Sequence, residues 1–353
     1  MSGQTSNANA IVDIGGMIRV ALPIGNTPIR ELSVLLDGRH YHIGLKMEGE
    51  NPFGSVKDRT AAFLLRDVER RGLINTGSTI IESTSGNLGV ALANLCRLKG
   101  YEFIAVIDPK TTAENVKRLE ESGALIEMVN ETDEMGGYLL TRLKRVADLC
   151  RANRNIVWVN QYANSANPLA HSLTTGPEIL SQMRENVEAI FVPISTGGTI
   201  AGISRFSRSA SPSTMIVAVD AEGSVAFGGC SSPRKLTGIG SSRRSEFLNS
   251  NTFDELVFVS DAEAFSLCNI LYSITGLKIG GSGGAAVAAC LRLLNNSMKT
   301  FHRIVCICPD RGENYNSSIF SEDWLLGNGF TGLDRKPPLY DFSLEAAGIT
   351  SGH

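Results

Sequence analysis

Lys57 has the setting of a reactive lysine. It follows a turn of Pro, Gly and Ser residues at 52–55 and precedes the apolar run Thr60 to Leu65, so its amine is expected near the start of a helix. Burial or nearby cations lower the pKa of such an amine, and enzymes use it as a nucleophile that forms Schiff bases with carbonyl compounds. The alternative is a solvated charged triplet, Lys57 to Arg59, that opens an amphipathic helix.

Four other segments are rich in small and hydroxyl residues. The first, Glu82 to Gly89, offers hydroxyls, an amide and backbone N–H groups at the positive end of an expected helix, which suits a carboxylate or a phosphate. Capping that helix would need one such residue, and the segment has four of them, at 83, 84, 85 and 87. Because ligands of open parallel sheets bind where strands end and loops lead into helices, we expect these segments to form the site.

The second segment, Ser195 to Thr199, has two glycines that let the backbone approach a phosphate and three hydroxyl side chains. The chain has no G-x-x-x-x-G-K-[ST] motif, so we expect a small-molecule monoester and not a nucleoside triphosphate. The third, Gly280 to Ala286, contains a G-x-G-x-x-A match without a convincing strand before it, so a dinucleotide-binding regulator is a weak alternative. The fourth is Cys308 to Tyr315.

Strands that alternate with helices would position these segments, and this rhythm predicts an α/β fold with two parallel sheets covered on both faces. The predicted strands are 40–46, 79–81, 103–107, 125–129, 156–159, 189–192, 216–219 and 304–307. The predicted helices are 87–98, 138–152, 176–184, 198–208 and 284–295, with one more around Val116 and Leu119. A Ser-, Arg- and Gly-rich loop, 228–245, is long for a compact domain, and such loops often carry function.

Composition excludes several classes of function. The 353 residues carry a formal net charge of -3 without a basic or acidic block, so neither nucleic acid nor a membrane surface is an expected partner. No run of about 18 apolar residues occurs, and residues 1–10 have neither a basic start nor an apolar centre. We expect a soluble cytoplasmic protein with a disordered head over residues 1–14.

Metal binding is not expected either. Seven scattered cysteines in a chain of this size indicate reduced, mostly buried thiols. Cys306 and Cys308 are too close for a C-x-x-C metal pair, and alternation along a strand would put both on one face. The five histidines form no zinc-protease or Ser-His pattern.

The motifs occur in the order found in fold-type II pyridoxal-phosphate enzymes, and the chain resembles the cysteine synthase and cystathionine β-synthase group of that family. The motifs that carry the resemblance are Gly25 to Pro28, Ser55 to Arg59, Ser83 to Asn87, Ser195 to Thr199 and Gly281 to Gly283. The resemblance spans roughly residues 24–325. It implies two three-layer αβα domains of the tryptophan synthase β-like type, a larger one from 15–50 and 167–353 and a smaller, mobile one from 51–166, and a homodimer.

The resemblance also implies a role for each motif. Lys57 would form the Schiff base with pyridoxal 5'-phosphate, and Ser282 would meet the ring nitrogen. The residues expected to bind the cofactor's 3-oxygen and phosphate are Asn87 and Ser195, Thr196, Gly197, Gly198 and Thr199. The residues expected to hold the substrate carboxylate are Thr84, Ser85, Gly86, Asn87 and Gln161. Arg142 and Tyr162 would contact the leaving phosphate or a second carboxylate; the alternative for Arg142 is an exposed helix residue.

A hydroxyl beside the ring nitrogen implies an unprotonated ring, a weak electron sink that favours loss of the β-substituent followed by β-addition. Segments 108–110, 136–142, 160–164, 219–225 and 309–312 resemble a branch of the group that joins O-phospho-L-serine and L-glutamate through an aminoacrylate, in routes to 2,3-diaminopropionate for siderophores and antibiotics. Lys57 would remove the α-proton. The alternatives are β-replacement with a sulfur nucleophile and, from another class, a non-catalytic sensor or scaffold.

Overall fold

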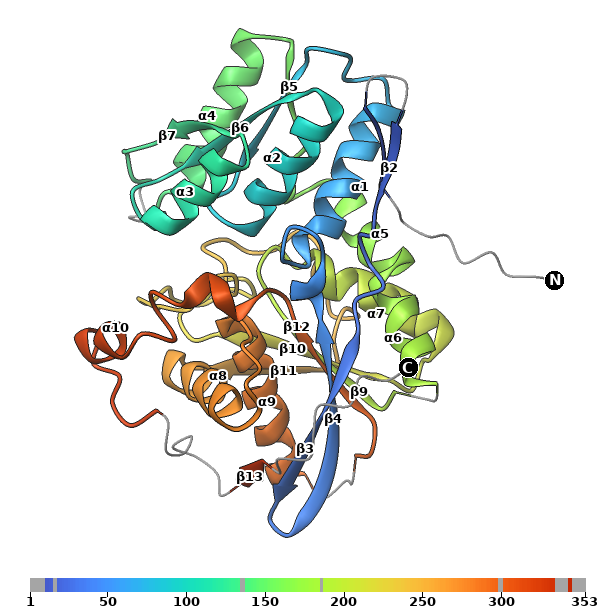
Figure 1. Cartoon of the computed structure of the whole chain (residues 1–353), viewed down its shortest axis with the longest axis vertical. Coiled ribbons are helices and arrows are strands. Elements are labelled where there is room, and N and C mark those ends of the chain that lie inside the picture. Colours follow the sequence, from blue (N-terminus) through green and yellow to red (C-terminus); the bar gives the residue numbers. More distant parts are fainter. Residues whose placement is uncertain are drawn as a thin grey trace, which may run out of the picture. The chain divides into compact units, whose positions relative to one another are not determined.

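The computed structural model describes residues 10–14, 18–133, 137–184, 187–297, 301–333 and 342–344, and the chain divides into two compact units (Figure 1). Unit 1 comprises Met1–Asn26, Asn51–Phe53 and Lys57–Ala170; unit 2 comprises Thr27–Glu50, Gly54–Val56 and His171–His353. Residues 1–9 of the expected head lie outside the described residues. Residues 10–14 form β1 (Ala10–Ile14), which pairs antiparallel with β2 (Ile18–Leu22). The mobility of the smaller domain stays a prediction.

Unit 1 is built on a four-stranded parallel sheet in the order β7-β6-β5-β8. The strands are β5 (Thr79–Ser83), β6 (Glu102–Ile107), β7 (Leu125–Met128) and β8 (Ile156–Trp158). The helices are α1 (Lys57–Arg70), α2 (Asn87–Lys99), α3 (Ala113–Glu121), α4 (Leu139–Ala152) and, before unit 2 resumes, most of α5 (Ala166–Leu173). Ile80 packs with α1 and α2, whereas its neighbour Ile81 packs with α4. The alternation of strand side chains therefore gives the sheet two apolar faces, each covered by helices.

Unit 2 contains a seven-stranded mixed sheet in the order β11-β10-β9-β12-β4-β3-β13. The strands are β3 (Ile29–Leu36), β4 (Arg39–Met47), β9 (Ala189–Pro193), β10 (Met215–Ala221), β11 (Glu255–Val259), β12 (Ile304–Cys308) and β13 (Phe342–Leu344). The helices are α6 (Thr175–Met183), α7 (Gly198–Ala210), α8 (Asp261–Thr275), α9 (Gly281–Asn296) and α10 (Glu322–Gly327), with 3₁₀ turns η1 (Glu48–Glu50) and η2 (Gly312–Tyr315).

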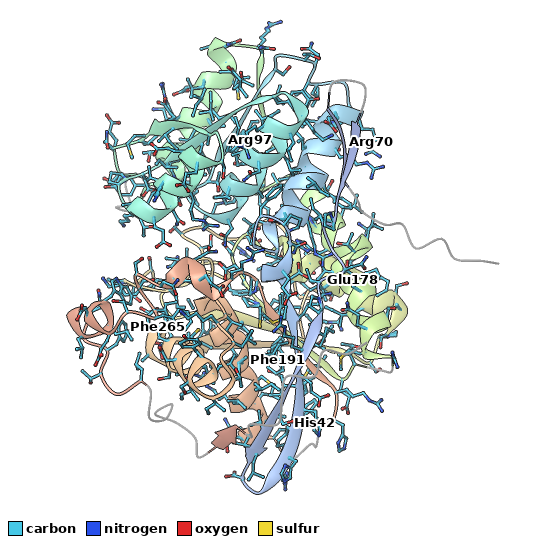
Figure 2. All side chains as sticks on the ribbon, viewed as in Figure 1. His42, Arg70, Arg97, Glu178, Phe191 and Phe265 are labelled. Atoms are coloured by element: carbon cyan, nitrogen blue, oxygen red, sulfur yellow. The ribbon has the colours of Figure 1, made fainter. Side chains whose placement is uncertain are left out.

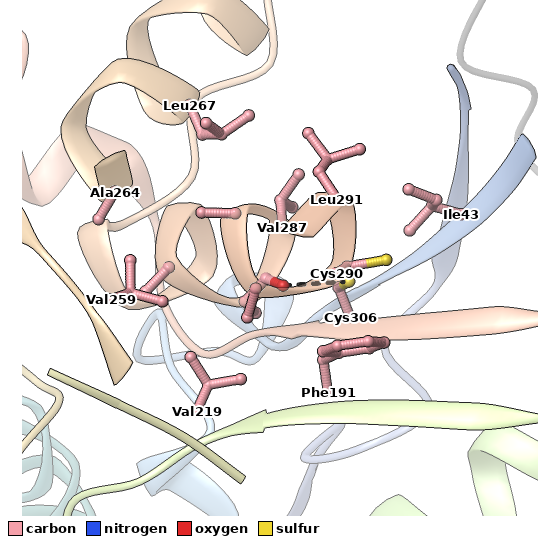
Figure 3. Packing of buried hydrophobic residues seen from close by; sticks show 14 of the residues in the cluster. Ile43, Phe191, Val219, Val259, Ala264, Leu267, Val287, Cys290, Leu291 and Cys306 are labelled. Atoms are coloured by element: carbon pink, nitrogen blue, oxygen red, sulfur yellow. Dashed lines mark hydrogen bonds between the residues drawn. The ribbon is translucent and has the colours of Figure 1, made fainter. Parts of the chain in front are cut away.

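The core of unit 2 again divides between the two faces of its sheet. Phe191 and Cys306 pack with α8 and α9, whereas the adjacent Ile190 and Val305 pack with α6 and α7. Phe191 and Phe265 point into the unit (Figure 2) and are fully buried. Figure 3 shows α9 lying along the sheet, where the Cys306 thiol donates to the carbonyl of Ala286 at 3.6 Å. Residues of β9 and β12 are thus buried on both faces of the sheet, which fixes the two strands in place.

The predicted α/β pattern is confirmed for most elements, and its failures have physical reasons. The α8 helix was missed because Ala264 to Cys268 are all buried, so no polar face marks a helical period. The segment Gly280 to Ala286, before which the sequence shows no convincing strand, opens α9 and follows α8. Cys306 and Cys308 are both buried free thiols, as expected. Within the described ranges, no helix has the length and apolar character needed to cross a membrane.

Candidate functional site

Lys57 is the first residue of α1, and the backbone on both sides of it is fixed. The N–H of Val56 donates to the carbonyl of Pro309 at 2.7 Å, and the carboxylate of Asp58 accepts from the N–H of Phe53 at 2.6 Å. Asp58 and Arg59 are 0% and 1% exposed. The solvated charged triplet is therefore the wrong interpretation of this stretch, and the lysine amine extends from a backbone that is held in place.

The β5–α2 junction in unit 1 contains Thr84, Ser85, Gly86 and Asn87, which are predicted to bind a carboxylate. The hydroxyl of Thr84 accepts from the N–H of Gly89 at 3.1 Å, which folds the segment back onto the helix. Gly86 occupies the N-cap position and has no side chain with which to cap α2. The arrangement keeps the positive end of α2 suited to an anionic ligand.

The segment after β8 lies against this junction because β8 and β5 are parallel neighbours. The amide of Gln161 is buried and donates to the carbonyl of Ser83 at 3.0 Å, and the Tyr162 hydroxyl lies 3.5 Å from the same carbonyl. The structure thus brings Gln161 and Tyr162 to the segment that is predicted to bind the substrate carboxylate. Their contact with a substrate stays a prediction.

Arg142 is not the exposed helix residue of the alternative interpretation. Its side chain is 11% exposed, and its Nε lies 3.3 Å from the carboxylate of Asp108, the residue that follows β6. Within the part of the chain that the structure describes, Nε and Nη1 are buried without a hydrogen-bond partner. A buried guanidinium with donors to spare is suited to a phosphate or carboxylate. Asn87 also has a cationic neighbour, since Nη1 of Arg118 donates to its Oδ1 at 3.3 Å.

Glu82, at the end of β5, was quoted in the sequence motif but was given no role. Its side chain is fully buried and accepts hydrogen bonds from the indole N–H of Trp158 and from two backbone N–H groups, those of Ser83 and Gln161. Burial raises its pKa from 4.5 to about 7, although these bonds and the charge of Arg142 oppose the shift. The sequence signal that could have identified Glu82 is an acidic residue directly before a hydroxyl-rich loop.

The predicted phosphate loop in unit 2 joins β9 to α7. Gly197 has φ +87°, and a Cβ there would collide with the Ser245 hydroxyl, so only glycine fits. That hydroxyl donates to the carbonyl of Thr196 at 2.6 Å. Thr199 lies 3.3 Å from Nε2 of the buried His171. His171 and Ser245 were missed because they come from segments far away in the sequence.

Ser282, in the first turn of α9, fits its predicted role toward a ring nitrogen. The side chain is 1% exposed, and its hydroxyl has no hydrogen-bond partner in the described ranges. A buried hydroxyl without a partner costs free energy unless a ligand satisfies it. The unprotonated nitrogen of pyridoxal phosphate would be a suitable acceptor for this O–H, so the residues present fit the cofactor.

Comparison with known proteins gives consistent matches. The family model described as pyridoxal-phosphate dependent enzyme matches residues 20–310. The chain is 43% identical over 302 residues to N-(2-amino-2-carboxyethyl)-L-glutamate synthase of Ralstonia nicotianae and 42% identical over 304 residues to the protein of that name in Cupriavidus metallidurans; each match covers 86% of this chain and 89% of the relative.

Solved structures of two other synthases have the same fold. The crystal structure of O-ureido-L-serine synthase is 29% identical, with a TM-score of 0.77 over 86% of this chain and 97% of that one. The O-acetylserine dependent cystathionine beta-synthase from Helicobacter pylori is 30% identical, with a TM-score of 0.75 over 84% and 95%.

Proposed function

The chain belongs to the family of pyridoxal-phosphate dependent enzymes, and from this premise we propose that it joins O-phospho-L-serine and L-glutamate to give N-(2-amino-2-carboxyethyl)-L-glutamate and phosphate. The predicted fold-type II architecture and the predicted enzyme class, a β-replacement synthase, are confirmed by the comparisons. The observation that carries the choice of substrates is the identity of 42–43% with two synthases of that product. The buried cation Arg142 supports it.

When bound, pyridoxal phosphate withdraws electrons from the substrate α-carbon, which acidifies the α-proton and lets the β-substituent leave. We assign the protein's own groups as follows. The amine of Lys57 would hold the cofactor covalently and would take the α-proton of the substrate. The N–H groups and hydroxyls of Ser195 to Thr199 bind the cofactor phosphate. Ser282 donates to the ring nitrogen, and a neutral donor there leaves the nitrogen without a proton.

We assign both neutral and charged groups to substrate binding. Thr84, Ser85, Asn87 and Gln161 hold the α-carboxylate through hydroxyl, amide and backbone donors, which fix the α-carbon without burying another charge. Arg142 binds the phosphate that leaves from the β-carbon, because its planar guanidinium can donate to two oxygens at once. Tyr162 adds a hydroxyl beside this position.

To test this proposal, the purified protein is loaded with pyridoxal phosphate and then incubated with O-phospho-L-serine and one nucleophile at a time: L-glutamate, sulfide or L-homocysteine. Phosphate release is followed by colour assay and products by mass spectrometry. We expect a secondary-amine product with glutamate and none with the Lys57→Ala variant. A thiol or thioether product formed faster than the glutamate adduct would instead establish the sulfur-nucleophile alternative. Borohydride reduction followed by peptide mapping tests whether the cofactor is attached to Lys57.

We also propose that the enzyme is a cytoplasmic homodimer, which is an expectation from its group. Light scattering after size-exclusion chromatography gives the mass directly, and a monomer of 37.8 kDa would contradict it. Fractionation of the source cells tests the location.

A further inference from the structure

We propose that Glu82 is a positioning residue that holds together three segments of the site: the carboxylate loop after β5, the Gln161 segment after β8, and the first turn of α1. This inference rests on the proposed role of these segments in binding substrate and cofactor. All three segments belong to unit 1.

Glu82 contacts the first two of these segments directly and uses both carboxyl oxygens within the protein. Oε1 accepts from the N–H of Ser83 at 2.8 Å and from the indole N–H of Trp158 at 3.0 Å. Oε2 accepts from the N–H of Gln161 at 2.8 Å. Because the side chain is 0% exposed and each oxygen already accepts a bond, Glu82 acts on these segments and not on the substrate itself.

The network continues from Gln161 to the helix that begins with Lys57. The carbonyl of Gln161 accepts from the amide of Asn167 at 2.8 Å, and the hydroxyl of Thr60 donates to Asn167 at 3.4 Å. Thr60 lies three residues after Lys57, within one turn of α1. A second link, from the Gln161 amide to the carbonyl of Ser83 at 3.0 Å, closes the network on the carboxylate loop.

The chemistry of these contacts favours an acidic side chain over an amide. All three partners of Glu82 are N–H donors, so the side chain has to be an acceptor at both ends. An amide of the same size would direct its NH₂ group at one set of donors and release that segment. Burial disfavours the charge of the side chain and raises the pKa of Glu82, so the charged form that accepts all three bonds becomes more populated as the pH rises. A buried acidic side chain whose two oxygens accept only from N–H groups of the site segments is placed to hold those segments.

The test compares Glu82→Gln with Glu102→Gln in the full-length protein loaded with pyridoxal phosphate. Glu102 is a matched control because it lies on the adjacent strand β6, and its carboxylate accepts one bond, from the Thr79 hydroxyl at 3.0 Å. Hydrogen exchange measured by mass spectrometry reports the segments directly. In Glu82→Gln we expect faster exchange at residues 83–88, 57–61 and 160–163 and unchanged exchange in β6. In Glu102→Gln we expect unchanged exchange at the same three segments.

Steady-state kinetics provide the second readout. Glu82→Gln is expected to raise the KM for O-phospho-L-serine on the order of tenfold, since the loop that holds the carboxylate is loosened, and to lower kcat less than it raises KM. Exchange that is unchanged in the three segments, or that rises equally throughout the protein, would overturn the proposal. If the variant does not fold, Trp158→Phe removes one of the three donors and must raise exchange at residues 82–85.

The exchange result does not depend on which nucleophile the enzyme uses. A wild-type protein that fails to act on O-phospho-L-serine therefore disproves the proposed function while exchange still decides the role of Glu82.

Discussion

Glu82 is expected to make unit 1 less stable as the pH rises through neutrality. Burial raises the pKa of this carboxyl from 4.5 to about 7 in the folded protein. Between these values the folded chain keeps a proton that the unfolded chain has released, so Glu82 contributes its full stabilisation below pH 4.5 and loses it as the pH rises through 7. At 1.36 kcal/mol per pKa unit, the loss amounts to about 3 kcal/mol of unfolding free energy.

One tryptophan can report this loss. The chain has two tryptophans: Trp158, whose indole N–H donates to Glu82, and Trp324, which packs against Phe265 in unit 2. In a Trp324→Phe background, urea unfolding of the cofactor-free protein is followed by Trp158 fluorescence between pH 4.5 and 8, with and without Glu82→Gln. The difference between the two pH curves isolates Glu82, because all other titrating groups are shared.

We expect the parent protein to lose stability relative to Glu82→Gln over this range, with most of the change between pH 5 and 7. Glu102→Gln, on the neighbouring strand, is expected to give a curve parallel to that of the parent. Curves for Glu82→Gln and the parent that stay parallel would show that the buried carboxyl has an ordinary pKa. A difference of the opposite sign would show that its three hydrogen bonds outweigh burial.

Three other predictions concern single side chains. Arg142→Ala should raise the KM for O-phospho-L-serine about tenfold to a hundredfold, since a charge-assisted bond contributes about 1.5–3 kcal/mol. Arg145 lies on the same helix and is an exposed partner of Glu127, so Arg145→Ala should leave the steady-state kinetics unchanged. Gly89→Ala places a Cβ 2.6 Å from Leu119 and 3.0 Å from the Thr84 methyl, so calorimetry should show a loss of about 1–3 kcal/mol; Gly327→Ala, with no atom within 4 Å, should show none. Glu178→Ala removes a carboxylate 2.8 Å from the fully buried Lys46, and urea unfolding should reveal a loss of about 3–5 kcal/mol.

The sequence predicts the parts of this structure that depend on local pattern. Strand and helix periods place the junctions before α2 and α7, and small polar residues mark them as ligand loops because few other residues suit a turn into a helix terminus. Such junctions can be recognised within a window of about ten residues. The roles of Ser282 and Gln161, in contrast, were assigned through the resemblance to fold-type II enzymes and not from local pattern.

What the sequence does not predict are contacts that join distant segments. Nothing in the residues around Asp58 and Arg59 tells that both are buried, because that depends on what packs over the start of α1. The hydroxyl of Ser245 meets the carbonyl of Thr196 only after a long loop folds back on β9. Glu82 accepts hydrogen bonds from Trp158 on β8 and from Gln161 just after it, both more than 70 residues away. Burial of a charge is a property of the assembled unit, so local charge patterning gives the wrong answer there.

The position of β4 has a consequence for synthesis of the chain. Residues 43–47 of β4 pair in parallel with residues 304–308 of β12, in the interior of the unit 2 sheet. A ribosome therefore has to make nearly the whole protein before this sheet can close, whereas the four parallel strands of unit 1 all lie between residues 79 and 158 and can pair while translation continues. During that interval β3 and β4 can pair only with each other, so the edge of β4 that later pairs with β12 stays open in the nascent chain.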